Sequence, residues 1–200
     1  MIIQIAGYLS GVVALVSFVP YIKSIFEGKT KPERASWIIW AALSLTAFFP
    51  QLYKGASYSL FMTGAAALGD FLIFLFAIKY GIGGLLKRDI IALVGLILGL
   101  SLWYITKEAA LALYIVILID ATGAVLTIVK TYQYPESENM GSWWLTFFAA
   151  IMACVAVGSF NAFLLSYPLY VALASLSILA SIYLGFRKQK ILSFKDAVKL

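Results

Sequence analysis

Two acidic residues, Asp70 and Asp120, stand within long apolar stretches of the 200-residue sequence. Asp70 lies between Gly69 and Phe71, and Asp120 lies between Ile119 and Ala121. A charged side chain at the centre of a membrane-spanning helix costs at least about 2.5–3.5 kcal/mol, so it usually faces a bundle interior or a wet cavity. We expect each acid to bind a substrate cation or a proton. The alternative is a protonated or hydrogen-bonded clamp between helices.

Trp40 and Trp144 are further candidates for a solute site, because a flat indole can stack on a sugar or on a heterocyclic base. Trp37 and Trp143, by contrast, match the tryptophans that anchor helices at a membrane surface. Pro20 lacks a backbone N–H and permits a kink, which makes it a candidate hinge. Its alternative is a simple helix end.

Several kinds of chemistry are excluded by composition. The sequence contains no histidine and one cysteine, Cys154. Histidine-based zinc sites and nucleophile activation are therefore ruled out, and so is an internal disulfide. A glycine-rich phosphate loop is also missing. We expect no enzymatic activity, no bound metal and no cofactor.

The composition indicates a membrane protein. Hydrophobic residues make up 63% of the chain and charged residues 12%, whereas soluble domains average about 45–50% and about 25%. The mean hydropathy is +0.97. The apolar runs are continuous, without the alternation of barrel strands, so they predict an all-α polytopic membrane protein.

Seven segments are candidate transmembrane helices, because each approaches the 20 or so apolar residues that span a bilayer. They are Ile2–Ile22, Ala35–Leu52, Tyr58–Ile78, Ile90–Thr106, Ala109–Val129, Gly141–Phe160 and Phe163–Phe186. The gap between the last two is marked only by small and polar residues at 158–161.

Basic residues fall mainly on one side of this topology. Thirteen lie in or beside the first, third and fifth loops and in the C-terminal tail. Two, Lys54 and Lys107, lie on the opposite side. This bias predicts a protein of the cell membrane with its N-terminus outside and its C-terminus in the cytoplasm. The net charge of +6 is thus an orientation signal, and we expect no nucleic-acid partner. The basic tail at 187–200 could also rest on an anionic leaflet.

An ordered series of Lys, Pro-Glu and Ser-Trp occurs twice and indicates an internal duplication. The first copy is Lys23, Pro32-Glu33 and Ser36-Trp37, and the second is Lys130, Pro135-Glu136 and Ser142-Trp143. Three-helix halves at 1–86 and 109–186 would run in parallel if a linking helix at 87–108 separates them. The sequence therefore predicts seven helices as two parallel repeats plus a linker.

This 3+1+3 layout, with Pro20 near the cytoplasmic end of the first helix, resembles the PQ-loop superfamily. That superfamily includes SWEET sugar transporters, SemiSWEETs, lysosomal amino-acid exporters and KDEL receptors. The motif glutamine is replaced by Tyr21, and Thr127 replaces the proline of the second half. The resemblance implies alternating access with proline hinges. SWEET-like proteins use asparagines near the central site; the candidate here is Asn161, although Asp70 is the nearer analogue on the third helix.

The leading hypothesis is a small-solute transporter that works by alternating access. Asp70, Asp120 and Trp40 would line its central site, and the solute would be a sugar, amino acid, nucleoside or similar polar or cationic metabolite. The alternative is a non-transporting membrane receptor or assembly subunit on the same scaffold. The bilayer is the expected partner, and the Gly7-xxx-Gly11 spacing leaves a homo-oligomer open.

Overall fold

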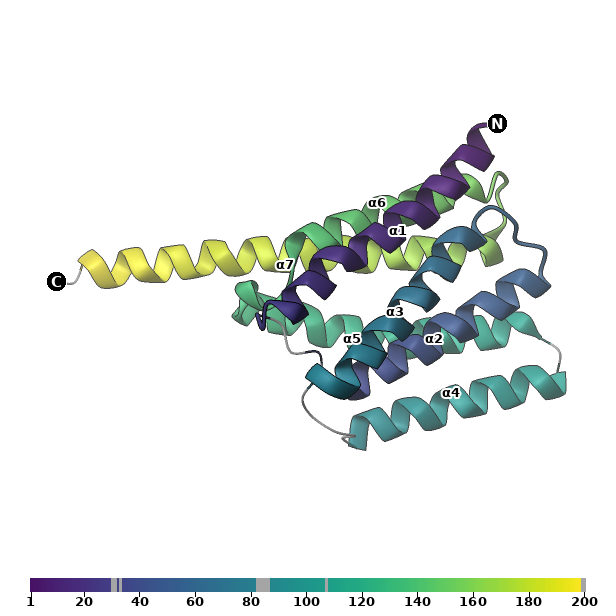
Figure 1. The fold of residues 1–200 in the computed structure, drawn as a ribbon, viewed down its shortest axis with the longest axis horizontal. Coiled ribbons are helices and arrows are strands. Elements are labelled where there is room, and N and C mark those ends of the chain that lie inside the picture. Colours follow the sequence, from purple (N-terminus) through teal and green to yellow (C-terminus); the bar gives the residue numbers. More distant parts are fainter. Residues whose placement is uncertain (30–31, 33, 82–86, 107, 199–200) are drawn as a thin grey trace.

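The computed structural model describes residues 1–29, 32, 34–81, 87–106 and 108–198 of the chain (Figure 1). Within these residues the regular structure is helical throughout, as the apolar runs predict. The helices are α1 (Ile2–Phe26), α2 (Arg34–Tyr53), α3 (Leu60–Tyr80), α4 (Lys87–Thr106), α5 (Ala109–Gln133), the 3-10 helix η1 (Pro135–Ser137), α6 (Met140–Ala156) and α7 (Ala162–Val198).

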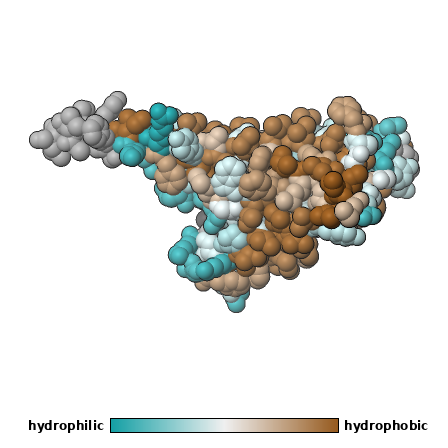
Figure 2. Space-filling model, turned by 90° about the horizontal axis from the view of Figure 1, so that it is seen from above, coloured by the Kyte–Doolittle hydropathy of each residue, from teal (hydrophilic) through white to brown (hydrophobic). Residues whose placement is uncertain are grey.

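Four helices in the described part of the chain are long and apolar enough to cross a membrane. These are α1, α3, α5 and the Ala162–Ile191 portion of α7. Shorter apolar stretches lie in α2, at Trp37–Tyr53, and in α6, at Met140–Ala156. Figure 2 shows a hydrophobic surface over the middle of the molecule, with hydrophilic residues toward its ends. The protein is therefore an all-helical membrane protein whose environment is a lipid bilayer.

The helices before α4 (α1, α2 and α3) are called the first group, and those after it (α5, α6 and α7) the second. In one group α3 packs against α1 and α2, and in the other α7 packs against α5 and α6. The groups meet where α1 lies along α6 and where α2 lies along α5. α4 packs on α5 and α2 at the edge of the bundle (Figure 1).

Small side chains explain the close contact between α1 and α6. Within a bilayer, helices associate through packing rather than through a hydrophobic driving force, and small residues let their backbones approach. The buried residues of α1 include Gly7, Ser10, Gly11, Ala14 and Ser17, and those of α6 are Ala149, Ala150, Ala153 and Ala156. The serine hydroxyls add no unpaired polar group, because each donates to a carbonyl of its own helix.

Gly7 and Gly11 also face the start of α3. A Cβ at Gly7 would lie 2.5 Å from the Cβ of Tyr58, and one at Gly11 would lie 2.9 Å from the Cβ of Phe61. These glycines therefore serve contacts within the chain. A second pair at the same spacing, Gly95 and Gly99, lies within α4.

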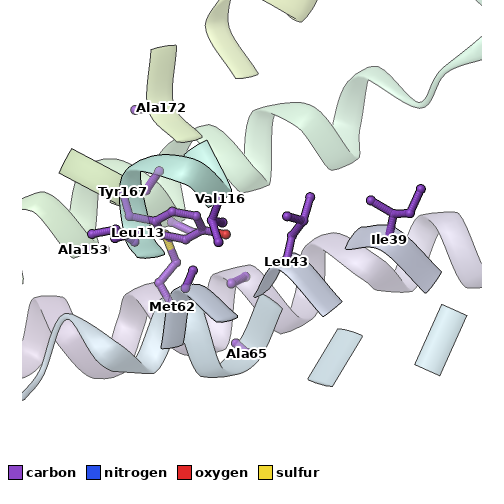
Figure 3. Packing of buried hydrophobic residues seen from close by; sticks show 13 residues of the cluster. Ile39, Leu43, Met62, Ala65, Leu113, Val116, Ala153, Tyr167 and Ala172 are labelled. Atoms are coloured by element: carbon purple, nitrogen blue, oxygen red, sulfur yellow. The ribbon is translucent and has the colours of Figure 1, made fainter. Parts of the chain in front are cut away.

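The main core cluster lies between the two groups of helices. Figure 3 shows Met62 of α3, Leu113 and Val116 of α5 and Tyr167 of α7 packed together. Leu113 and Val116 are 0% and 1% exposed. This packed cluster therefore fixes the positions of polar side chains on the same helices.

Four predicted helix ends differ from the structure by four residues or more; among them, α5 continues past Val129 to Gln133, and α6 ends at Ala156 instead of Phe160. α1 continues past Ile22 to Phe26, so Pro20 lies inside a helix rather than at its end. α7 continues as one helix from the membrane segment through the basic tail to Val198. Neither Gly nor Pro occurs in 186–198, and its Lys, Arg, Gln and Leu residues favour the helix.

The predicted gap before the last helix is confirmed. α6 ends at Ala156 and α7 begins at Ala162. Gly158 turns the chain between them with a φ of +73°, a conformation that glycine adopts without steric cost.

Candidate functional site

Five polar side chains from four helices form what we call the acid–hydroxyl cluster. They are Ser44 of α2, Asp70 of α3, Asp120 of α5, and Tyr167 and Tyr170 of α7. Ser44, only 4% exposed, donates a short hydrogen bond from its Oγ to Oδ2 of Asp70. The carboxylate of Asp70 is therefore held by a neighbouring helix of the same group.

Tyr167 connects the two helix groups within the cluster. The residue is 5% exposed, and its ring packs in the core beside Leu113 (Figure 3). Its hydroxyl interacts with Ser44 and lies close enough to both Asp70 and Asp120 to feel their charge. The Tyr167 hydroxyl thus lies near both acids.

Asp120 has its own adjacent hydroxyl, that of Tyr170. Among the described residues, the buried Tyr170 oxygen has no hydrogen-bond partner of good geometry, although it lies beside the Asp120 carboxyl group. The rings of Tyr167 and Tyr170 lie 6.5 Å apart. Aromatic faces therefore border the cluster on its α7 side.

Trp40 lies one helical turn before Ser44 on α2, on the same face of the helix. A Cβ at Gly123 of α5 would lie 3.6 Å from its indole nitrogen, so the ring lies beside this glycine. Gly123 in turn follows Asp120 by three residues. Trp40 also meets Trp37 edge to face, with ring centroids 5.0 Å apart. The indole thus lies within a turn of the cluster, next to both helix groups.

The cluster has negative groups without a described positive partner. The ion pairs among the described side chains join Glu27 to Lys29 at 2.7 Å and to Lys23 at 3.7 Å. The hydrogen bond from Lys29 lowers the pKa of the Glu27 carboxyl in this solvent-exposed loop. Asp70 and Asp120 have no such pairing in this part of the chain. Buried carboxylates are costly unless a proton or a cation neutralises them.

Two surface cavities lie away from the cluster. One, of about 320 Å³, is lined by Tyr132, Leu184, Arg187, Lys188 and Ile191. The other, of about 330 Å³, is lined by Pro20, Lys23, Ser24, Glu27, Lys29 and Asn139. Neither is lined by Asp70 or Asp120, and both acids are half-buried within the bundle.

The structure brings together three of the predicted site residues and places three elsewhere. Asp70, Asp120 and Trp40 lie in or beside the cluster. Trp144 is 41% exposed on the outside of α6 and stacks on Phe148. The exposed Asn161 accepts a hydrogen bond from the N–H of Leu164 and caps α7.

Pro20, the predicted hinge, lies in the last third of α1. It lies within the helix, at the rim of the 330 Å³ cavity, and this position is compatible with bending. Neither acid lines that cavity. It is thus separate from the acid–hydroxyl cluster.

Sequence reasoning missed the three hydroxyl residues of the cluster. Ser44 lies four residues after Trp40, so helical spacing from a known candidate could have indicated it. Tyr167 and Tyr170 are three residues apart around Pro168, which puts both on one side of α7. Tyrosine and serine are ordinary within apolar helices, so their types alone gave no signal.

No family model, curated protein or solved structure matches this chain. The function is therefore inferred from the arrangement of the cluster itself.

Proposed function

We propose that this protein is a small-solute membrane transporter whose substrate site is the acid–hydroxyl cluster. The observation that carries the proposal is the meeting of Asp70 and Asp120, from different helix groups, with no described basic partner. Intramembrane acids that face a bundle interior are typical of substrate and proton pathways. The site best suits a polar metabolite that carries a positive charge, or one that moves together with a proton.

The helix contacts support two parallel repeats on either side of a linking helix. In each half, residues 1–86 and 109–186, the third helix packs against the first and the second. Contacts between the halves are also reciprocal, since α1 meets α6 and α2 meets α5. Two repeats related by an axis along the membrane normal would make this pattern, and alternating access would rock one against the other.

All seven α-helices would cross the membrane in this proposal, with the N-terminus outside and the C-terminus in the cytoplasm. Figure 1 shows the two termini at opposite ends of the bundle, as an odd number of crossings requires. The 3+1+3 order is also the reason to place the chain with the PQ-loop superfamily. Pro20 and the loop that follows it remain the residues on which that relationship rests.

A second function, a non-transporting receptor or assembly subunit, is favoured by one observation. Neither surface cavity is lined by the acids, and Ser44 already satisfies one oxygen of Asp70. The cluster would then be a polar clamp that holds four helices together. A transporter would show the same hydrogen bond between Ser44 and Asp70, so the two functions are separated by solute binding.

The proposal is tested by a thermal-shift screen of the purified protein, followed by uptake into proteoliposomes. The screen would compare amines, neutral sugars and nucleosides, and organic anions at equal concentration. We expect stabilisation and uptake of a cationic solute, lost in Asp70→Asn and in Asp120→Asn. The matched control is Glu108→Gln, which removes the same charge at an exposed position at the start of α5.

Two results would count against the proposal. If no solute class stabilises the wild type, the clamp is the better interpretation. If Asp70→Asn leaves uptake unchanged at every pH, the residue has no role in proton coupling.

A further inference from the structure

The 320 Å³ groove at the far end of α7 combines two cations with apolar walls. Arg187 and Lys188 are its charged lining residues, and Tyr132, Leu184 and Ile191 form the rest. The described residues that line it include no acid. A groove of this composition is complementary to an anionic group that is attached to an apolar chain.

The groove lies at the level of the membrane surface. Its Tyr132 belongs to the last turn of the candidate span that ends at Gln133, and Ile191 ends the candidate span of α7. Past this point α7 continues alone, beyond the end of α5 (Figure 1). Basic pockets beside transmembrane helices at this depth are where phospholipid head groups bind.

The wall of the groove is held firmly by contacts between α5 and α7. Ser181 donates to the carbonyl of Ile128, and its hydroxyl is 3.1 Å from that of Thr131. A Cβ at Gly185 would lie 2.7 Å from the carbonyl oxygen of Thr131, so this glycine lets the helices touch. The groove is thus preformed, which lowers the cost of ordering it on binding.

The two cations remain available for a ligand. Lys188 lies over the ring of Tyr132, with Nζ 4.7 Å from its centroid, which positions the ammonium without neutralising it. The nearby acid Glu136 contacts Gln189 instead, at 3.5 Å. Arg187 can bind two phosphate oxygens at once, and Lys188 adds a point charge.

An apolar surface leads from the groove into the membrane. On α5, Val129 and Val125 are 50% and 57% exposed, and they lie one and two turns before Tyr132. On α7, Leu184 is 47% exposed. Acyl chains that follow this surface would remain in contact with the head group in the groove.

We propose that the groove between the end of α5 and α7 binds the phosphate head group of an anionic phospholipid, with Arg187 and Lys188 as its ligands. This inference is independent of what the acid–hydroxyl cluster transports.

The test uses native mass spectrometry of the full-length protein in detergent, titrated with phosphatidylglycerol or with zwitterionic phosphatidylcholine. We expect retention of phosphatidylglycerol in preference, and a loss of about fivefold for Arg187→Gln or Lys188→Gln. The matched control is Lys79→Gln, because Lys79 also lies over a tyrosine, with Nζ 5.1 Å from the ring of Tyr80, but does not line the groove.

A second variant, Ile191→Glu, places an acid at the groove without removing either cation, and it should also lower phosphatidylglycerol retention. Thermal unfolding like that of the wild type would show that the variants fold. The proposal is overturned if phosphatidylcholine binds equally well, or if Lys79→Gln loses as much as Lys188→Gln. It is also overturned if soluble glycerol 3-phosphate competes at the same concentration as the lipid, because the site would then recognise free phosphate.

Discussion

The hydrogen bond from Ser44 to Asp70 should be measurable as a coupling energy between α2 and α3. The perturbation is a double-mutant cycle of Ser44→Ala and Asp70→Ala. A hydrogen bond to a charged group contributes about 1.5–3 kcal/mol in soluble proteins, whereas cycles in a membrane protein average about 0.6 and reach about 1.7. Ser44 is almost fully buried, which favours the upper part of that range.

One neighbour lowers this expectation. Tyr167 lies beside Ser44 and within the field of Asp70, so its hydroxyl can partly replace the lost donor in Ser44→Ala. We therefore expect a coupling of about 1 kcal/mol. The assay is reversible unfolding in mixed micelles with increasing dodecyl sulfate, followed by far-ultraviolet circular dichroism.

Thr46 supplies the matched control on the same helix. It is as buried as Ser44, but its hydroxyl donates to the carbonyl of Ala42 at 2.8 Å within α2. The cycle of Thr46→Ala with Asp70→Ala should be additive to within about 0.5 kcal/mol. A Ser44–Asp70 coupling as small as that of the control would refute the bond as a link between helices.

Three further predictions concern stability: two add a methyl group at a glycine, and one removes a serine hydroxyl. Gly7→Ala should destabilise the protein by about 1–3 kcal/mol through overpacking, because the new methyl group would lie within 3 Å of the backbone at Tyr58. Gly64→Ala meets only the edge of the Phe48 ring, at 3.4 Å, and should stabilise by up to about 1 kcal/mol. Both changes in stability are measured by thermal unfolding, detected with a thiol-reactive dye at Cys154. An equal effect of the two substitutions would contradict the prediction. Ser181→Ala should cost about 1 kcal/mol by removing the donor between α5 and α7, and an unchanged melting temperature would show that this contact adds no stability.

The apolar runs were sufficient to predict the helices, because long apolar segments in lipid have few alternatives to helix. Helix ends were less predictable. Pro20 was compatible with a hinge or with a helix end, and the structure places it inside α1. The charges after Phe186 did not end α7. Hydropathy reports where a helix leaves the membrane, which need not be where it stops.

The cluster was predictable only in part. Asp70 and Asp120 were conspicuous because a carboxyl group is rare in an apolar helix. Their hydroxyl neighbours were not, since nothing about Tyr170 or Ser44 distinguishes them until the helices are placed side by side. Asn161 is a different case, since it is polar, lies at the start of the last helix, and caps that helix with its side chain.

Each acid of the cluster has a hydroxyl on its own side of the boundary between the helix groups. Asp70 and Ser44 lie on α3 and α2, while Asp120 and Tyr170 lie on α5 and α7. Of the contacts described within the cluster, those of Tyr167 with Ser44 and Asp70 cross this boundary, besides the repulsion between the acids. Parting the groups would therefore separate the Tyr167 phenol from its neighbours and, with both acids ionised, would also relieve the repulsion between them. A positive charge bound between the acids would remove the repulsion and hold the two groups together. Its departure would allow the groups to separate.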